Sequence, residues 1–540
     1  MNKRYKTPVV AAIAAVIGVV LGFYLIPTSK DRNFPTKGGK IDYILSLIDS
    51  QYVDKVNMDS LQDEAIRSFL ADLDPHSVYM TAEEIKKENE VLQGNFDGVG
   101  IQFRIIEDTI VVLQTINPGP SQRAGIMAGE RKDKDKRKKK KKRLGVKVDG
   151  KNVTGKDISN DKAFKLLRGK KGTKVSLSVH RSGVNKTINY NITRAPIPIH
   201  SVDYYGMLDK LTGYIKLSQF TANSYSEVHS ALLKLQDKGA KQLIFDLRAN
   251  GGGYLDQAIK IADEFLPEDD LIVFTNGRYR GRNDYFATSE GIFEKGKLIV
   301  LIDEISASAS EIVSGALQDN DRAIIIGRRT FGKGLVQEQK ELPDGSAIRL
   351  TVSRYYTPSG RCIQRPYISG DPEKYFADFI ERYANMEKHS DTISHADSLK
   401  YKTKKGRIVY GGGGIEPDVE LPYYNYKRGE YYTTLLKKGL IYKYCFDYVD
   451  RNRNNFSTYK DGDDFLNRYT VSEDFYQSML NFASEQNTTR GRLTTAETKE
   501  VKQLMKAYIA QNLYGDQYFY PSFLKTDEDI IEALQYFKKM

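Results

Sequence analysis

Cysteine and histidine are both scarce in this chain of 540 residues, which has two of the former and six of the latter. Cys362 and Cys445 are too few for a disulfide framework and match no zinc-site spacing, so a single bridge and two free thiols both stay open. The histidines form neither a His-Glu-x-x-His pattern nor another ligand cluster. We therefore expect no metal ion and no cofactor.

Positive charge is also scarce outside one segment. The net charge is +12, but Arg131–Arg143 alone holds eleven Lys or Arg and two Asp, which leaves about +3 for the rest of the chain. The chain therefore lacks the general basic face of a nucleic-acid binder, and we expect no nucleic-acid partner. We expect the basic segment 130–143 to be a solvated loop. Contact with anionic lipid and an oddity of the sequence itself are the alternatives.

Residues 1–27 have the composition of a membrane signal. Asn2–Lys6 carries three positive charges, and Val9–Ile26 follows as eighteen uncharged residues. That length is long for a signal-peptide core and just spans a bilayer, and no clean Ala-x-Ala site follows. We expect an uncleaved signal anchor, with a cleaved signal as the alternative. The positive flank then places the body of the protein on the periplasmic or other extracytoplasmic side of the membrane.

The period of the apolar residues divides the remaining chain into regions and predicts a multidomain α+β protein. The expected regions are a Gly-, Lys- and Pro-containing linker over 28–39, a helical region over 40–94, short strands over 95–195, alternating strands and helices over 196–421, and a helical region rich in Tyr and Phe over 422–540. Within the α/β region, buried strands are expected at Gly213–Leu217, Leu243–Leu247, Leu298–Ile302 and Ala323–Ile326. The region over 422–540 shows no recognisable chemistry.

Two short motifs of the α/β region supply a hydroxyl and an amine. Ser306–Glu311 opens an apolar helical pattern, and Thr330–Gly334 follows a short strand, with no histidine near either motif. A helix N-terminus offers free N–H groups and a positive partial charge, which suit a developing oxyanion. The pair indicates a serine hydrolase whose base is a lysine. An N-cap serine and a solvated lysine are the plain alternatives.

A lysine can act as a base only when it is neutral, and its ordinary pKa near 10.4 forbids that at neutral pH. Apolar neighbours such as Phe331 and Leu335 would lower the pKa of Lys333 by burial. The competing interpretation of Gly327–Gly334 is a phosphate-binding loop. It is disfavoured because Gly334 stands where the magnesium-binding hydroxyl belongs and a strand-like pattern follows where a helix is needed.

A third motif, Asp246–Gly253, comes directly after a buried strand. Its three consecutive glycines allow backbone N–H groups to approach a ligand closely. The motif therefore predicts either an oxyanion donor or a tight turn between a strand and a helix.

In this order the motifs resemble those of the carboxyl-terminal processing, or tail-specific, serine peptidases, over about residues 41–421. The matching segments are Leu73–Ser77, Gly98–Phe103, Asp246–Gly253, Ser306–Glu311, Thr330–Gly334, Tyr356–Gly360 and Gly413–Asp418. The resemblance implies a mixed α/β protease domain over 196–421 and a PDZ domain over 95–195. It also implies an endopeptidase that cleaves exported proteins near their C-termini with a Ser–Lys dyad.

By position, the resemblance assigns the nucleophile to Ser308 and the general base to Lys333. Ser306 and Ser310 are the rivals for the nucleophile. Gln337 matches a third member found in some relatives and would orient the amine of Lys333.

The resemblance also assigns supporting roles around this dyad. The oxyanion donors would be the N–H of Ala309 and one N–H from Gly252 or Gly253. Asp319 matches an acidic position near the end of the nucleophile helix, where we expect structural support.

In the PDZ domain, the resemblance assigns the binding of a terminal carboxylate to the loop Gly98-Val99-Gly100-Ile101. Arg168 matches a position thought to couple this domain to the protease. The basic segment 130–143 departs from the family pattern and puts one strand of this domain in doubt.

The sequence thus predicts a membrane-anchored endopeptidase whose partners are protein substrates, recognised through unstructured or apolar C-terminal tails. The alternative is a peptide-binding scaffold with an inert or gated protease domain. An adaptor protein and further copies of the chain are additional partners that the resemblance leaves open.

Overall fold

The computed structural model describes residues 39–106, 109–126, 147–153, 158–179, 186–385, 397–422 and 428–540. The chain divides into two compact units at Phe69 and Leu70. The predicted anchor over 1–27, nearly all of the linker and the basic segment 130–143 lie outside the described residues. Within these ranges, no helix is both long enough and apolar enough to cross a bilayer.

The expected N-terminal helices are present, but the region over 40–94 is not helical throughout. Its helices are α2 (Gly39–Gln51), α3 (Met58–Ala71) and α4 (Ala82–Leu92). Between α3 and α4, Val78–Met80 form strand β1, because the turn at Leu73–Ser77 ends the helical pattern and the next residues pair with β18 (Ala347–Tyr356). The helical prediction is therefore wrong for these three residues.

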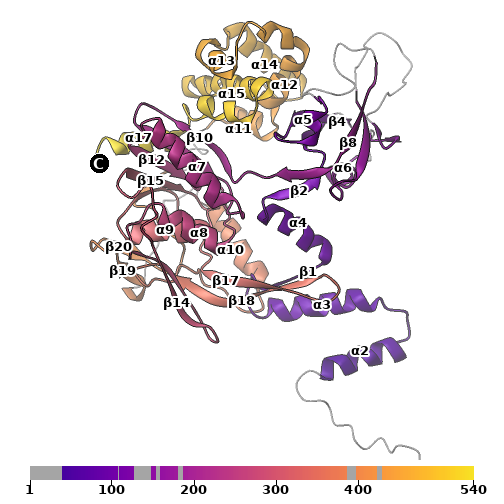
Figure 1. Ribbon diagram of the computed structural model, residues 1–540, viewed down its shortest axis with the longest axis vertical. Helices are drawn as coiled ribbons and strands as arrows, with labels where there is room; N and C mark the ends of the chain where they lie inside the picture. Colours follow the sequence, from indigo (N-terminus) through magenta and orange to yellow (C-terminus); the bar gives the residue numbers. More distant parts are fainter. Residues whose placement is uncertain are drawn as a thin grey trace, which may run out of the picture. The chain divides into compact units, whose positions relative to one another are not determined.

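A six-stranded sheet forms the centre of the α/β region, in the order β10-β11-β12-β15-β16-β21. Figure 1 labels β10, β12 and β15 of this sheet. Its strands are β10 (Val202–Met207), β11 (Thr212–Leu217), β12 (Gln242–Asp246), β15 (Lys297–Ile302), β16 (Ile324–Gly327) and β21 (Val419–Glu420). All neighbours pair in parallel except β10 with β11. The four strands predicted from apolar runs are thus confirmed, since central parallel strands are buried on both faces.

Helices cover both faces of this sheet. One face packs against α7 (Ser224–Asp237), α8 (Leu255–Asp263) and α9 (Ala309–Asp319). Every residue of α9 is buried. The other face packs against α17 (Glu528–Phe537), whose Ile530 and Phe537 contact the cluster of Tyr214 and Ile299. A helix from the 422–540 region therefore completes the core of the sheet (Figure 1).

A second, antiparallel sheet carries the strand that follows the lysine motif. It has the order β1-β18-β13-β14, with β17 also paired to β18. The further strands are β13 (Leu271–Gly277), β14 (Gly281–Phe286) and β17 (Leu335–Glu341). The strand predicted after Lys333 is thus confirmed. Helix α10 (Pro372–Asn385) and the hairpin of β19 (Lys400–Lys402) and β20 (Ile408–Tyr410) lie in the polar segment that follows β18.

The region over 95–195 is built from short strands around an apolar core, as predicted. Its elements are β2 (Asn95–Gly98), β3 (Ile101–Ile106), β4 (Thr109–Thr115), α5 (Pro120–Arg123), β5 (Lys147–Val148), β6 (Lys151–Asn152), α6 (Asn160–Leu167), β7 (Lys174–Val179), β8 (Ile188–Thr193) and β9 (Ala195–Pro198). Strand β3 pairs with β4, and β2 pairs with β9 where the chain enters and leaves the region.

The region over 428–523 is helical and has an aromatic core of its own. It contains α11 (Glu430–Lys437), α12 (Leu440–Asn452), α13 (Gly462–Arg468), α14 (Glu473–Glu485), α15 (Thr495–Tyr514) and α16 (Tyr520–Phe523). The capping-box residues Thr494 and Glu497 begin α15. Cys445 is buried in this core, and both cysteines are free thiols.

The buried ion pair of Asp319 and Arg361 gives a test of the fold. Both side chains are fully buried, with 2.8 Å between Arg361 Nη2 and Asp319 Oδ1. Because Asp319→Ala leaves the guanidinium buried without its counter-charge, we expect the free energy of unfolding to fall by about 3–5 kcal/mol. Urea denaturation measures this loss. The exposed Asp344→Ala is the control, and an equally small effect for both would contradict the prediction.

Candidate active site

Ser308 lies at the N-cap of α9, in the loop that follows β15. Its backbone has φ 54° and ψ −111°, a region that residues other than glycine adopt only under strain. Ser308 is half-buried, whereas Ser306 and Ser310 are completely buried. Of the three serines in the motif, Ser308 is therefore the one that solvent reaches.

The two buried serines join this loop to the Asp246–Gly253 loop. Ser306 Oγ donates to the carbonyl of Leu247 at 2.8 Å, and Ser310 Oγ donates to the carbonyl of Asn250 at 2.8 Å. Their hydroxyls thus serve the packing of two loops.

The carboxylate of Glu311 connects the serine motif to the lysine motif. Its Oε2 accepts the backbone N–H of Ser308 at 2.8 Å and that of Lys333 at 2.9 Å. Its Oε1 accepts the N–H of Gly332 at 2.7 Å and the hydroxyl of Thr330 at 2.5 Å. Burial raises the pKa of Glu311 to about 7, against the effect of these four hydrogen bonds. Glu311 was assigned no role from the sequence, although its place three residues after the N-cap serine is the capping-box signal.

Tyr355 supplies a second connection between the same two residues. Its buried hydroxyl lies 2.7 Å from the carbonyl of Lys333 and 3.2 Å from the carbonyl of Ser308. Both backbone groups of Ser308 and of Lys333 are therefore fixed by shared partners.

The amine of Lys333 has a defined partner and a perturbed pKa. Lys333 Nζ donates to Gln337 Oε1 at 2.9 Å, and Gln337 Nε2 donates to the carbonyl of His76 at 2.5 Å. Burial lowers the pKa of Lys333, and the positive charge of Arg349 lowers it further, while nearby carboxylates oppose the shift. The pairing with Gln337 matches the arrangement expected from the sequence.

His76 lies beside this lysine, which the sequence did not reveal. Burial and the charge of Lys333 lower the pKa of His76 to about 4, so its ring is neutral at neutral pH. The Nε2 of His76 lies 3.2 Å from the hydroxyl of Tyr375. Asp74 stabilises the turn that contains His76 by accepting the backbone N–H of His76 at 2.9 Å. The motif Leu73–Ser77 is the sequence feature that could have indicated a role for His76. The position of this motif beside Lys333 depends on the pairing of β1 with β18.

The glycine loop approaches Ser308 closely, but one of its two predicted donors is already engaged. The N–H of Gly252, one of the two alternatives for the second donor, donates to Asn250 Oδ1 at 2.9 Å, which leaves the N–H of Gly253 as the other alternative. A Cβ on Gly252 would lie 2.9 Å from Ser308 Cβ and 3.0 Å from Ala309 N, so only glycine fits here. In the described part of the chain, the N–H groups of Gly253 and Ala309 have no hydrogen-bond partner.

Asp319 is at the opposite end of α9 from Ser308. Its Oδ2 accepts the N–H of Ser359 at 3.1 Å, and its Oδ1 pairs with Arg361. These contacts hold the segment after β18 and bring no charge to the serine.

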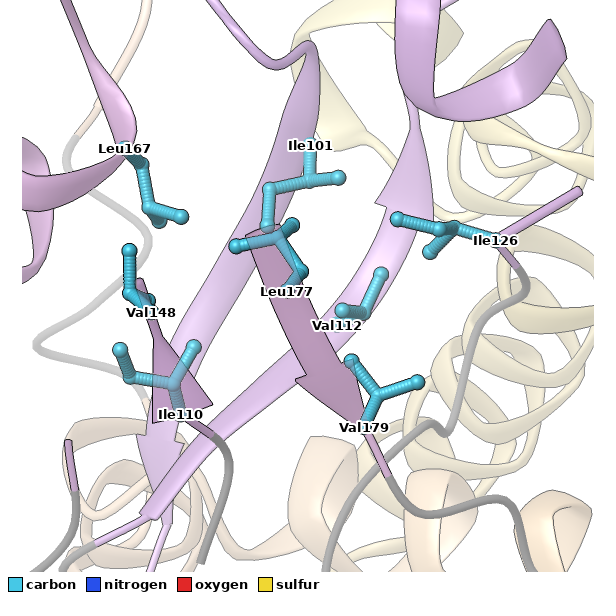
Figure 2. A pocket seen from close by; sticks show the side chains of 8 residues that line it. All are labelled: Ile101, Ile110, Val112, Ile126, Val148, Leu167, Leu177 and Val179. Atoms are coloured by element: carbon cyan, nitrogen blue, oxygen red, sulfur yellow. The ribbon is translucent and has the colours of Figure 1, made fainter. Parts of the chain in front are cut away.

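The predicted carboxylate-binding loop lies between β2 and β3. Gly98, Val99 and Gly100 are buried, and the carbonyl of Val99 accepts the hydroxyl of Ser121 at 2.6 Å. Ile101 begins β3 and lines an apolar pocket that reaches Leu167 of α6 (Figure 2). The remaining lining residues are Ile110, Val112, Ile126, Val148, Leu177 and Val179.

Arg168 ends helix α6 and contacts helix α4. Its Nη1 lies 2.6 Å from Glu90 Oε2, and its guanidinium stacks on the ring of Phe96 at 4.5 Å. Arg168 thus links the 95–195 region to the helix that precedes it.

No metal centre is found among the residues that the structure describes. Within those ranges, no three His, Cys, Asp or Glu side chains are grouped so that they could hold an ion.

Three family models match the chain. They are Peptidase family S41 over residues 211–373, the N-terminal domain of the activating protease CtpB over 27–84, and a family of unknown function over 431–515. The first match covers the serine and lysine motifs, and the third covers most of the helical region after residue 428.

Curated relatives match over a longer stretch. The carboxy-terminal-processing protease of Bartonella bacilliformis is 36% identical over 378 residues, which cover 68% of this chain and 83% of that protein. The carboxy-terminal processing protease CtpA of Bacillus subtilis is 32% identical, over 71% of this chain and 79% of its own length. A solved photosystem II D1 C-terminal processing protease is 25% identical over 73% of this chain and 89% of that one, with a TM-score of 0.36. The chain belongs to peptidase family S41, among the carboxy-terminal-processing proteases, and is a protease.

The raised pKa of Glu311 provides a test of the hydrogen bonds by which this carboxyl joins the serine motif to the lysine motif. The pKa is about 7 in the folded chain, against an ordinary value of 4.5. Because the folded state holds the proton more tightly, this carboxyl makes the free energy of unfolding fall by about 3 kcal/mol as the pH rises from about 4.5 to about 7. Glu311→Gln should lack this dependence, which urea denaturation at both pH values measures.

The control for this measurement is Glu341→Gln, which removes an exposed carboxyl from β17. Its unfolding free energy should follow the pH dependence of the wild type. Parallel pH curves for the wild type and Glu311→Gln would contradict the prediction.

Proposed function

We propose that this protease is a serine endopeptidase that uses Ser308 as nucleophile and Lys333 as general base. The observation that carries the proposal is the shared bonding of both residues to one oxygen of Glu311, at 2.8 Å and 2.9 Å. This bonding fixes the half-buried serine and the desolvated lysine to one rigid centre, as nucleophilic catalysis requires.

In the proposed reaction, neutral Lys333 Nζ takes the proton of Ser308 Oγ as this oxygen attacks the scissile carbonyl carbon. The resulting oxyanion accepts hydrogen bonds from the N–H groups of Ala309 and Gly253. The ammonium of Lys333 then gives its proton to the leaving amine, and the C–N bond breaks. Water hydrolyses the acyl-enzyme by the same steps in reverse, with Lys333 again as base.

The surroundings of Lys333 favour its neutral form. Burial and the charge of Arg349 both disfavour the ammonium. Gln337 accepts one N–H of Lys333 at 2.9 Å and is itself held by the carbonyl of His76. The free lone pair can then point toward the serine, so we assign Gln337 an orienting role.

The region over 95–195 supports a proposal for substrate recognition. We assign the PDZ domain to residues 95–195, between the helical region over 40–94 and the protease domain over 196–421. In a PDZ domain, a peptide adds to a sheet edge while backbone N–H groups bind its terminal carboxylate. The loop Gly98–Ile101 would supply these groups, and Ile101, which is only partly buried, would contact an apolar final side chain. Arg168, paired with Glu90, would couple this domain to the protease.

We infer from the sequence that the protein is anchored at a membrane. The uncharged stretch Val9–Ile26 behind three positive charges favours an anchor, with the protease outside the cytoplasm. Its substrates would then be exported proteins with unstructured C-terminal tails.

Cleavage of an unstructured protein with an apolar C-terminus tests the dyad. We expect Ser308→Ala and Lys333→Ala each to lower kcat of the full-length chain by about four orders of magnitude or more, since the two residues act as a unit. Turnover is followed by gel and mass spectrometry.

Ser226→Ala and Lys340→Ala are the matched controls, because both side chains are exposed, Ser226 on α7 and Lys340 on β17. Their folded fractions should keep activity. An active Ser308→Ala variant would overturn the proposed nucleophile. A wild type that binds the tail without cutting it would favour the scaffold.

The pH profile tests the base. Because the amine must be neutral, kcat/KM should rise with pH through the pKa of Lys333, with a midpoint below about 10.4. Arg349→Ala removes a charge that lowers this pKa and should move the midpoint to higher pH. The exposed Arg280→Ala should leave the midpoint in place. A midpoint that Arg349→Ala moves to lower pH would count against Lys333 as the base.

A further inference from the structure

Arg248 lies in the glycine loop and is surrounded by three carboxylates. Its guanidinium contacts Asp246 at 2.6 Å, Asp527 at 2.9 Å and Asp529 at 2.9 Å. The arginine side chain is 16% exposed, and the three carboxylates are 1–8% exposed. Asp527 caps α17 and Asp529 lies in its first turn, so two of the three carboxylates come from a helix far away in the sequence.

These contacts determine where the glycine loop begins. Asp246 accepts the backbone N–H of Arg248 at 2.9 Å and the hydroxyl of Tyr214 at 2.8 Å. Ala249 follows with φ 56°, in the left-handed region, and its N–H donates to Asp303 at 2.9 Å. The strained backbone of Ala249 persists only because the surrounding structure holds it. Asp303 holds its N–H, and the ion pairs of Arg248 hold the residue before it.

The loop passes this constraint on to Ser308. Asn250 is two residues beyond Arg248, and its side chain accepts the N–H of Gly252 at 2.9 Å. Gly252 in turn packs directly on Ser308 and the N–H of Ala309. A displacement of Arg248 therefore moves the backbone that faces the proposed oxyanion.

Helix α17 also contacts the loop that carries the lysine. Asp529 Oδ2 lies 3.3 Å from Nη1 of Arg328, which is five residues before Lys333. Arg328 Nε also pairs with Glu304 at 3.4 Å, in the loop before Ser308. The first turn of α17 thus contacts the glycine loop and the loop before Lys333 directly, and the loop before Ser308 through Arg328.

Docking of α17 does not require these charges. Ile530, Ala533 and Phe537 already bury its apolar face on the sheet. A buried ion pair adds little net stability, because desolvation offsets the attraction, but its geometry is specific. The acidic residues are therefore better explained by the position that they impose on Arg248 than by stability.

We propose that Asp527 and Asp529 are positioning residues for proteolysis, holding Arg248 so that the glycine loop presents the N–H of Gly253 to the oxyanion. This inference rests on the proposed function. It gives the region after residue 422, to which the sequence assigned no chemistry, a part in the reaction.

Neutralising variants of the full-length chain test the proposal. Asp527→Asn keeps the helix cap, because asparagine is an equally good N-cap residue, but removes the charge that faces Arg248. Asp529→Asn removes the second charge. Glu528→Gln is the matched control, since this neighbouring carboxylate pairs with Arg428 at 3.2 Å and not with Arg248.

We expect kcat to fall roughly 10-fold in each single variant and roughly 100-fold in the double variant, with KM nearly unchanged. The inhibition constant of a substrate-derived peptide aldehyde should rise in parallel, because its tetrahedral adduct needs the same N–H donors. Asp527→Glu should restore part of kcat. Glu528→Gln should behave as the wild type.

The outcomes separate this proposal from the proposed function. A double variant with wild-type kcat overturns the positioning role, as does a double variant that loses only thermal stability while its folded fraction turns over normally. A kcat loss without weaker aldehyde inhibition also overturns it. An active Ser308→Ala variant would contradict the proposed function instead, regardless of the kcat values of the aspartate variants.

Discussion

The site depends above all on one buried carboxylate. Glu311 gathers the backbone N–H groups of Ser308, Gly332 and Lys333 and the hydroxyl of Thr330 within 2.5–2.9 Å. These groups come from two loops that follow different strands of the sheet. With an acceptor at this point, both loops converge on α9. Without it, three N–H groups would lose their partners in a buried place, at a cost of about 1–3 kcal/mol each.

Burial has opposite outcomes for the titratable groups near Lys333 and for those around Arg248. Near the dyad, burial favours uncharged forms: it lowers the pKa values of Lys333 and His76 and raises that of Glu311. One loop away, burial alone would raise the pKa of Asp246, but the charges of Arg248 and Lys216 hold it below its usual range. In the proposed reaction, proton transfer would take place where burial disfavours charge, while the ion pairs of Arg248 hold the neighbouring backbone.

Much of this arrangement could be predicted from the sequence, and several of the failures concern contacts between distant segments. Apolar runs predicted the central strands, because burial on both faces is a local property of the sequence. The family resemblance implied that Gln337 orients the amine of Lys333. The place of His76 depends on β1 pairing with a strand some 270 residues later, and the place of Asp527 on a helix packing across the sheet. The hydrogen bond made by the Gly252 N–H could not be predicted either. Glycines allow the backbone to approach a neighbour closely, but they do not determine which N–H stays without a partner. The residues that connect the loops were therefore those that the sequence analysis missed.

The packing of α17 on the sheet has a consequence for how the chain acquires its shape. Strands β11, β12, β15 and β16, whose side chains α17 packs against, are complete by Gly327, while α17 begins only at Glu528. During synthesis, the apolar surface of Tyr214, Ile244 and Ile299 is therefore uncovered until residues 328–527 have been made. Such a surface is prone to aggregate or to engage chaperones during this interval.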